Sequence, residues 1–255
     1  VLSQIGGLNV KSSSGNPLNL DASIDMGGYG ASANSNTLVL VDGQLLNPID
    51  SGTINWESIP IDSIERIEVL QGGASVQYGN GAVGGVINII TNGGVKNLNQ
   101  ASVTYGSYNT VIGNAILRNK INDTTIQLTA NSSNTDGWRQ NSAANAYSFD
   151  GKVTQSLGGI DQVYADVFFN HSNSQTPGAV LGQAGRGNSQ SARATFIGST
   201  ITTDNSGIRA GFIKAIDDRL TFDIDGSYSN KNTSSNIPAF PYYVLYPNWQ
   251  LAVAP

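Results

Sequence analysis

Residues 37 to 91 read TLVLVDGQLLNPIDSGTINWESIPIDSIERIEVLQGGASVQYGNGAVGGVINIIT, and this stretch decides the fold class of the chain. Short apolar runs rich in β-branched residues alternate here with glycine turns, a pattern typical of short strands. Asp42-Gly43 separates two apolar runs, a position where this dipeptide closes a hairpin. We expect Ile64, Ile67 and Val69 to face a small core. The stretch therefore predicts a compact domain of mixed α and β structure.

Glycines gather near the end of this stretch, at Gly79, Gly81, Gly84 and Gly85. They permit positive backbone angles and close backbone packing. Three of them also match G-x-G-x-x-G, a dinucleotide-binding fingerprint that must open a helix. Residues 86–91 instead form the β-branched run VINIIT, and about twenty residues beyond Gly84, where the fingerprint expects an acid, the chain has Thr104. The glycines are therefore predicted to shape turns rather than to bind a nucleotide.

The ordered motifs of this stretch resemble the plug domain of TonB-dependent receptors of Gram-negative outer membranes. The matching pieces are LVLVDG at 38–43, Ile59-Pro60, IERIEVL at 64–70, Ala74-Ser75, Tyr78-Gly79 and GAVGGVINIIT at 81–91. The resemblance implies a plug domain over residues 1–97, followed over residues 98–255 by strands of an antiparallel transmembrane β-barrel. It also implies active uptake of a scarce ligand such as a ferric siderophore, haem or cobalamin, with a periplasmic TonB complex supplying the energy.

Composition is compatible with an outer-membrane location. Charged residues make up 12% of the chain, the formal net charge is -5, and cysteine is absent. No apolar run approaches the roughly 18 residues of a spanning helix. The lack of cysteine excludes disulfides and thiolate metal sites. The lack of a basic stripe argues against nucleic acid as a partner.

From Leu98 onward, segments of about ten residues alternate in polarity, as expected of strands that face lipid on one side and water on the other. The clearest segment places Tyr147, Phe149, Gly151, Val153 and Leu157 on one face and Ser148, Asp150, Lys152, Thr154 and Ser156 on the other. We count about seven such strands. Tight turns, such as Asn122-Asp123, alternate with long polar connections at 134–144 and 174–205, which are predicted to be outer loops.

A soluble β-sandwich also shows alternation and polar turns, so this half alone leaves both architectures open. With the plug resemblance, the prediction is an incomplete barrel of about 22 strands, because seven strands cannot enclose a plug. Residues 1–8 resemble the middle of a plug's first helix and turn. We expect a signal peptide, the TonB-coupling segment and the remaining strands to lie outside this chain.

Two departures from the family pattern concern arginine. The family commonly has Arg-Gly after its first strands and Arg-Gly-Pro after the Glu-Val-Leu run, whereas this chain has Gly27-Gly28 and Gln71-Gly72-Gly73. In the family, these arginines pair with glutamates of the barrel wall. We hypothesise that the matching wall glutamates are absent too, since a carboxylate left buried without its partner is costly.

The resemblance places substrate between the plug apices and the outer loops. The candidate substrate-binding residues are Tyr29, Asn36, Gln44, Asn47, Trp56, Gln77, Trp138 and Arg139, which could stack on or hydrogen-bond a metal chelate or macrocycle. For Tyr29 and Trp56 a packing role within the plug stays equally open, and Trp138 also fits an interfacial girdle. Glu65, Arg66 and Glu68 are candidates for anchoring the plug to the wall, with a solvated strand edge as the alternative.

Nothing in the sequence predicts an enzyme, a cofactor or a metal centre. His171 is the only histidine, and no serine has the strand and helix context of a nucleophile elbow. The predicted function is a receptor that transports its ligand across the outer membrane and contacts outer-membrane lipid. The alternative is a non-transporting surface β-barrel or an adhesion module.

Overall fold

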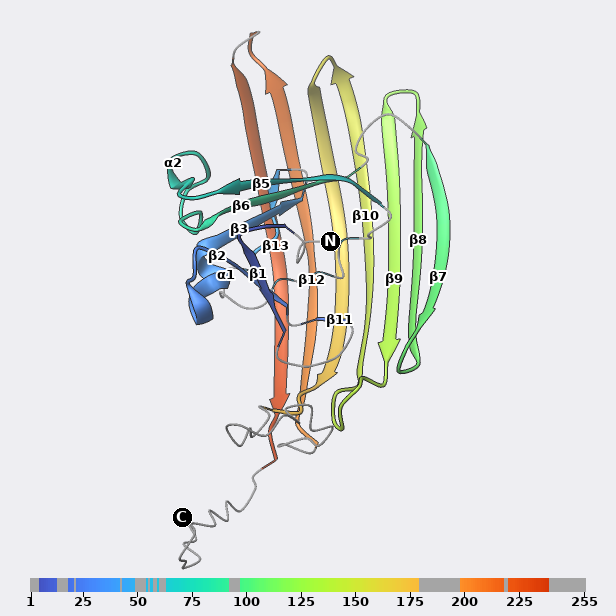
Figure 1. Ribbon diagram of the computed structural model, residues 1–255. Helices are drawn as coiled ribbons and strands as arrows, with labels where there is room; N and C mark the ends of the chain where they lie inside the picture. The colour runs from blue at the N-terminus through green and yellow to red at the C-terminus, as the bar shows by residue number, and fades with distance from the viewer. Residues whose placement is uncertain are drawn as a thin grey trace, which may run out of the picture.

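The computed structural model describes residues 5–12, 18–20, 22–41, 43–48, 54, 56, 59, 63–91, 97–178, 198–217 and 220–238. In this part of the chain, small elements precede a large sheet of long strands (Figure 1). The small elements are β1 (Leu8–Lys11), β2 (Ser23–Met26), η2 (Gly30–Ser32), α1 (Ala33–Asn36), β3 (Thr37–Val41), β4 (Gln44–Leu45), β5 (Ile64–Gln71), α2 (Ser75–Tyr78) and β6 (Gly85–Thr91). Leu8, expected in a helix and turn, instead begins a strand that pairs with β2.

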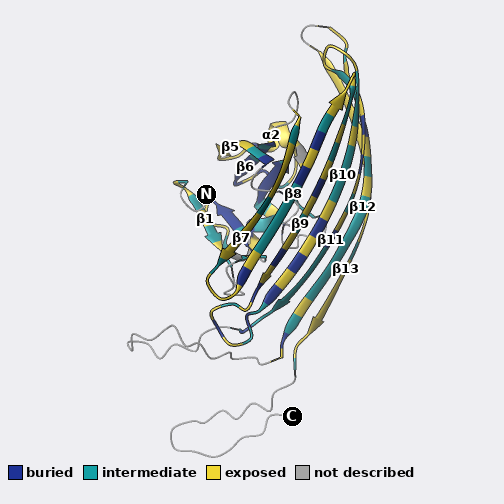
Figure 2. Ribbon diagram, turned by 90° about the vertical axis from the view of Figure 1, so that its right-hand side faces the viewer, coloured by how far each residue is buried: buried dark blue, intermediate teal, exposed yellow. Residues whose placement is uncertain are grey.

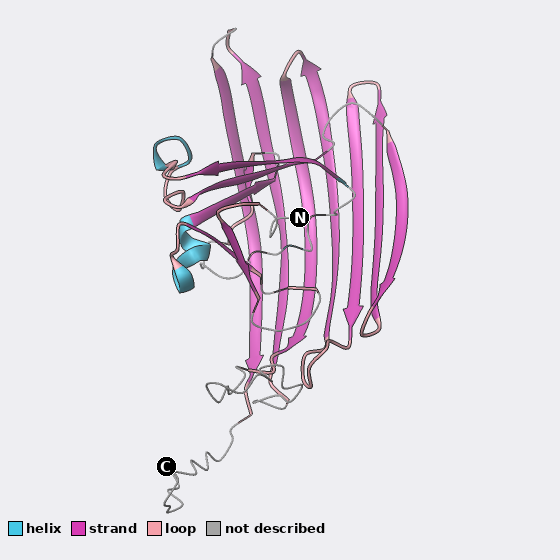
Figure 3. Ribbon diagram, in the orientation of Figure 1, coloured by secondary structure: helices cyan, strands magenta, loops and turns pink. Residues whose placement is uncertain are grey.

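Four of these strands form the plug sheet, in the order β4-β3-β6-β5. β3 and β6 are parallel, while β3 with β4 and β5 with β6 are antiparallel. Val41 pairs with Gln44 across the predicted hairpin, and Gly43 has a φ of +81°. The predicted hairpin is therefore confirmed, although Asp42 itself lies outside the described residues. Figure 3 shows the two short helices at one end of this strand assembly.

The described part of the plug has two apolar clusters, and the larger one joins the plug sheet to β2. Its buried members include Val39, Ile87 and Ile89 from the plug sheet, together with Ile24 and Met26 from β2. β-Branched side chains of the parallel pair β3 and β6 pack well here because the two strands lie at the centre of the sheet. The prediction for β5 is confirmed, because Ile64, Ile67 and Val69 pack against this cluster.

The second sheet contains seven antiparallel strands in strict chain order, from β7 at one edge to β13 at the other. Their bounds are β7 (Leu98–Gly106), β8 (Thr110–Ile121), β9 (Thr124–Thr135), β10 (Ala144–Gly158), β11 (Asp161–Gln175), β12 (Thr200–Ala215) and β13 (Thr221–Asn236). Short turns such as Asn122-Asp123 alternate with longer connections, as predicted. The 174–205 connection is shorter than expected, because β12 already begins at Thr200.

Along β10 and β11, side chains alternate between a more exposed and a more covered face. On β10 and β11 the apolar Phe149 and Val167 are 45% and 49% exposed, whereas Ser148 and Asp166 are 7% and 8% exposed. An apolar exposed face and a polar covered face reverse the arrangement of a soluble sandwich, and they suit a sheet with lipid outside. β11 has 15 residues and β12 has 16, more than the roughly 9–11 that span a bilayer, so these strands extend beyond the hydrocarbon layer.

The large sheet is curved, and the plug lies on its concave side (Figures 1 and 2). β6 ends at Thr91 and β7 begins at Leu98, so the division at residues 97 and 98 stays a prediction. Among the described residues, no helix is long and apolar enough to cross a membrane.

Candidate functional site

A turn presents Tyr29 at the surface of the plug, and a buried carboxylate fixes that turn. Asp25 is 4% exposed and accepts hydrogen bonds from the backbone amides of Tyr29 (2.8 Å) and Gly30 (2.9 Å). The Gly30 amide is the main cause that holds the pKa of Asp25 below its ordinary value. The Tyr29 side chain is 38% exposed. Asp25 is not among the residues predicted from the sequence, although an acid before a glycine-rich turn is a known turn signal.

The side chains of Asn36 and Asn47 bind the plug's own backbone. Asn36 Nδ2 donates to Ser32 O at 2.8 Å. Asn47 Oδ1 accepts from Val39 N at 2.6 Å, and its Nδ2 donates to Asn34 O and Thr37 O. The Asn47 side chain thus links the segment after β4 by hydrogen bonds to α1 and to β3. A role of either residue toward substrate stays a prediction.

The three other candidate substrate-binding residues of the plug, Trp56, Gln77 and Gln44, have different surroundings. Trp56 Nε1 donates to Ala22 O at 2.8 Å, and its ring packs against the plug core, in agreement with the alternative of a packing role. Gln77 lies exposed on the single-turn helix α2. Gln44 belongs to β4, and its side chain is outside the described part of the structure.

A charged group lies on the surface of β5. Arg66 Nε is 2.9 Å from Glu68 Oε1, and Arg66 Nη1 is 3.4 Å from Glu65 Oε1. Asn88 Nδ2 donates to the other oxygen of Glu68 at 3.4 Å. About half of each charged side chain is exposed. The three residues therefore form one surface group, whose role as a wall anchor stays a prediction.

Gly84 and Gly85 show why the plug motif is glycine-rich. A Cβ on Gly84 would overlap Met26 O and Asn36 O, and Gly85 has a φ of +145°. Gly79 and Gly81 have φ values of +78° and +93°. These angles and contacts agree with a role of the glycines in shaping the plug backbone.

The fold brings the two arginine-lacking positions together. Gly27 and Gln71 line one pocket of the plug, with Gly7, Met26, Tyr29, Gly72, Val83 and Gly84 as its other lining residues. Gln71 Nε2 donates a hydrogen bond to Gly6 O at 2.6 Å. The two positions at which this chain lacks the family's arginine are more than forty residues apart in sequence, yet both line this pocket.

The outer connections are tied to one another at one end of the large sheet. Asn141 Nδ2 donates to Thr176 O and Ser199 O, and Asn141 Oδ1 accepts from Gly198 N. Arg139 is 7% exposed, and its Nη1 donates to Gly178 O at 3.0 Å. Its guanidinium carbon lies 5.7 Å from the ring of Trp138, which is 37% exposed. Trp138 is thus the more accessible of the two predicted loop residues.

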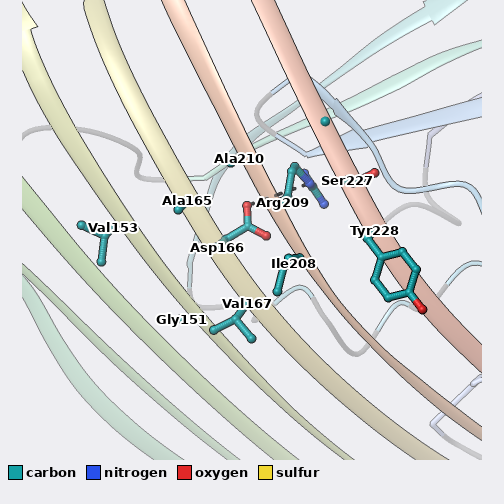
Figure 4. Close-up of a pocket in the computed structure, with 11 residues that line it drawn as sticks. Gly151, Val153, Ala165, Asp166, Val167, Ile208, Arg209, Ala210, Ser227 and Tyr228 are labelled. Carbon is teal, nitrogen blue, oxygen red and sulfur yellow. Dashed lines mark ion pairs between the residues drawn. The ribbon is translucent and has the colours of Figure 1, made fainter.

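The described wall also carries an ion pair. Asp166 Oδ2 on β11 lies 3.9 Å from Arg209 Nε on β12, and the two side chains point toward one another (Figure 4). The residues drawn in the same close-up line a pocket, and they include the small residues Gly151, Ala165 and Ala210. Within the described ranges, no group of three or more His, Cys, Asp or Glu side chains could hold a metal ion.

Comparisons with known proteins agree with this geometry. Residues 1–86 match the family model of the TonB-dependent receptor plug domain. The ferric enterobactin receptor of Pseudomonas aeruginosa is 45% identical over 80 residues, which cover 27% of this chain and 10% of that protein. The vitamin B12 transporter BtuB of Vibrio vulnificus is 40% identical over 92 residues, covering 36% of this chain and 14% of that protein.

Solved structures extend the likeness beyond the plug. The ferric citrate transporter FecA in its unliganded form matches 94% of this chain and 38% of its own, with a TM-score of 0.74 and 18% identity. The ferric yersiniabactin uptake receptor FyuA of Yersinia pestis matches 93% of this chain and 38% of its own, with a TM-score of 0.72 and 17% identity. The chain thus spans well under half of these transporters.

A plug on the concave face of an antiparallel wall that is apolar outside defines a plugged β-barrel of the outer membrane. Residues 1–86 are a TonB-dependent receptor plug domain, and the strands that follow share the fold of the barrel strands in the solved transporters.

Proposed function

We propose that the receptor containing this chain binds a scarce ligand outside the cell and imports it when a periplasmic TonB complex acts on the plug. The observation that carries this proposal is the position of the plug on the polar, concave side of the wall strands. A plug that blocks the lumen must change its contacts for cargo to pass, and a ligand or partner achieves this only by binding the two states differently.

For the ligand we propose a ferric siderophore, with cobalamin and haem as the competing cargoes. Siderophore receptors are prominent among the similar proteins, and a vitamin B12 transporter is also among them. The proposed contacts are the predicted residues at the plug apices and outer loop, of which Tyr29, Gln77 and Trp138 expose their side chains. Aromatic faces and amides suit a large chelate.

The test is uptake by the full-length receptor in cells that lack it otherwise. Labelled ferric siderophores, cobalamin and haem would be supplied separately, with and without an active TonB complex. We expect saturable uptake of one cargo that stops when TonB is removed. Binding to a surface partner without TonB-dependent uptake of any cargo would favour the adhesion module instead.

A matched pair of variants would test the site. Gln77→Ala removes an exposed amide of α2 and is expected to weaken binding of the imported cargo about tenfold. Val76→Ala is the control, because Val76 is a fully exposed neighbour on the same helix. Equal affinities of the two variants would remove Gln77 from the site.

A further inference from the structure

The concave face of the wall carries different side chains in its two halves. Residues directly opposite one another on neighbouring strands lie on the same face of a sheet. One row of opposite residues crosses all seven strands and consists of Ser102, Asn114, Asn131, Ser148, Asn170, Asn205 and Lys231. We call it the amide row. Neighbours along the strands, such as Phe149 and Phe169, are exposed on the other face, so the amide row faces the side on which the plug lies (Figure 2).

The half of this face nearer the outer connections has hydroxyl and amide groups with almost no charge. The next row toward those connections consists of Thr104, Ile112, Ser133, Ala146, Ser172, Thr203 and Thr233. Lys231, at one end of the amide row, carries the only formal charge of these two described rows. A ligand that enters the lumen from outside therefore meets uncharged hydrogen-bonding groups on this part of the wall.

Charges of the same face lie mainly in the half nearer the tight turns, where they balance. The cations of the described strands there are Arg118, Lys120, Lys152 and Arg209, and the carboxylates are Asp150, Asp166, Asp223 and Asp225. Asp166 and Arg209 form the ion pair described above. With equal numbers of both signs, this half supplies no net positive charge that would attract an anion.

Two polar atoms of the lumen face have hydrogen-bonding capacity left over. Within the amide row, Asn131 Nδ2 donates to Ser148 Oγ at 2.9 Å, and Asn114 Nδ2 donates to Ser102 Oγ at 3.3 Å. Thr129, the preceding residue of β9 on this face, is 3% exposed, and its Oγ1 has no hydrogen-bond partner within the described ranges. The same is true of Asn205 Oδ1, which is also buried. A buried polar atom without a partner is costly, so a ligand group that pairs with it is stabilised.

We propose that the amide row and the row beyond it select an uncharged ligand rich in hydrogen-bonding groups, an inference that rests on the import function proposed above. An anionic ligand would find no excess of cations on this wall, and the plug is acidic, since residues 1–97 contain eight acidic and three basic side chains. A charge without a partner in such a site is costly. A ferric hydroxamate chelate, whose ligand groups balance the ferric ion, and cyanocobalamin belong to the uncharged class, whereas a ferric catecholate chelate and haem are anionic.

The experiment measures equilibrium binding to the full-length receptor in detergent micelles, so that transport is not required. The probes are ferrichrome, which is an uncharged ferric hydroxamate, cyanocobalamin, ferric enterobactin and haem. We expect an uncharged probe to bind at least about tenfold more tightly than either anionic probe. Asn131→Lys adds a cation to the amide row and should lower this preference about tenfold. Asn230→Lys is the matched control, because it makes the same change at an exposed position on the other face of β13.

Tightest binding of an anionic probe would overturn the proposal and assign selection to other charges, such as Arg186 and Arg193 of the connection after β11, which lie outside the described residues. An equal change of preference in the two variants would overturn the role of the amide row, and so would the absence of binding by every probe. Heat-dependent gel migration shows whether each barrel is folded, and Asn114→Lys replaces Asn131→Lys if it is not.

Uptake into cells is measured separately with the same probes. Preferred binding of an uncharged probe without its TonB-dependent uptake would overturn the proposed import and leave the inferred selection standing. TonB-dependent uptake of an anionic probe that also binds most tightly would do the reverse. The two proposals therefore fail by different results.

Discussion

The side chain of Asn47 binds the backbone of Val39, with 2.6 Å between Asn47 Oδ1 and Val39 N. Val39 is fully buried at the centre of the plug core. The amide of a residue predicted to contact substrate thus completes the hydrogen bonding of a core strand. This contact, together with the two donated by Asn47 Nδ2, gives the residue a measurable structural role.

Asn47→Ala is expected to destabilise the plug by about 2 kcal/mol, because three partly buried hydrogen bonds to the backbone are lost. Hydrogen exchange of β3 peptides in the full-length receptor measures this change. Asn47→Asp is the companion variant: it keeps the acceptor for Val39 N but turns a carboxylate oxygen toward Asn34 O and Thr37 O, so it should cost at least as much as alanine. Normal β3 protection in Asn47→Ala, combined with lost ligand binding, would instead favour the substrate role.

Asp25 makes the plug sensitive to acid. Its folded-state pKa is lowered, so its stabilising effect is complete above the ordinary aspartate pKa near 3.8 and is lost as pH falls through the lower folded value. Protection of the Tyr29 and Gly30 amides should therefore decrease below about pH 4. Asp25→Asn should weaken these amides at neutral pH and flatten the acid dependence. An unchanged pH profile in Asp25→Asn would contradict the assignment.

Gly84→Ala is expected to prevent normal closure of the plug. The new methyl group would overlap the carbonyl oxygens of Met26 and Asn36, and two backbone segments cannot both move aside cheaply. We expect a loss of several kcal/mol of plug stability, of the size seen for severe overpacking. Gly73→Ala is the matched control, because its nearest neighbour, Val83 O, would be 3.9 Å away. Equal plug protection in both variants, measured by proteolysis, would refute this account.

Asn141 should control the outer connection between β11 and β12. Its side chain binds both ends of that connection, at Thr176 and at Gly198 and Ser199. Asn141→Ala is expected to increase protease cleavage about tenfold, both in the β11–β12 connection that Asn141 binds and near residues 136–143, because three hydrogen bonds are lost. Alanine also fits poorly at the φ of +59° that Asn141 has. Asn141→Gly separates the two causes, since it relieves the backbone angle but also lacks the side chain. Wild-type cleavage in Asn141→Gly would show that only the backbone angle matters.

The exposed face of the wall should tolerate charge poorly. Val167→Arg places a guanidinium among lipid chains and is expected to destabilise the inserted barrel by about 2–4 kcal/mol. Thr154→Arg is the control on the polar face of the neighbouring strand, where water can reach the charge. Denaturant titration of full-length receptors in lipid bilayers compares the two. Equal costs would mean that the apolar face does not contact lipid.

Much of the fold could be predicted from the sequence, because its signals are local. The two-residue alternation at 147–157 depends only on the opposite directions of successive side chains in a strand. The Asp42-Gly43 hairpin and the glycines at 79–85 depend on backbone angles that few residues adopt. Local signals also explain why the predicted 174–205 connection is too long. The first residues of β12, from Thr200, are as polar as the connection before them, so residue preferences alone do not mark where the strand begins.

Contacts between distant segments were decided by the tertiary structure alone. Strand register and chain topology decide three such contacts: the pocket that Gly27 and Gln71 share, the binding of Val39 by Asn47, and the ion pair of Asp166 with Arg209. A shift of register by one residue would turn a charged side chain such as Arg209 toward lipid, and no local pattern records which residue faces which across a sheet. By itself, the sequence determined a plug followed by barrel strands, because backbone angles and side-chain alternation are local. Only the tertiary structure decided which charges and amides meet, because pairing brings together residues far apart in the chain.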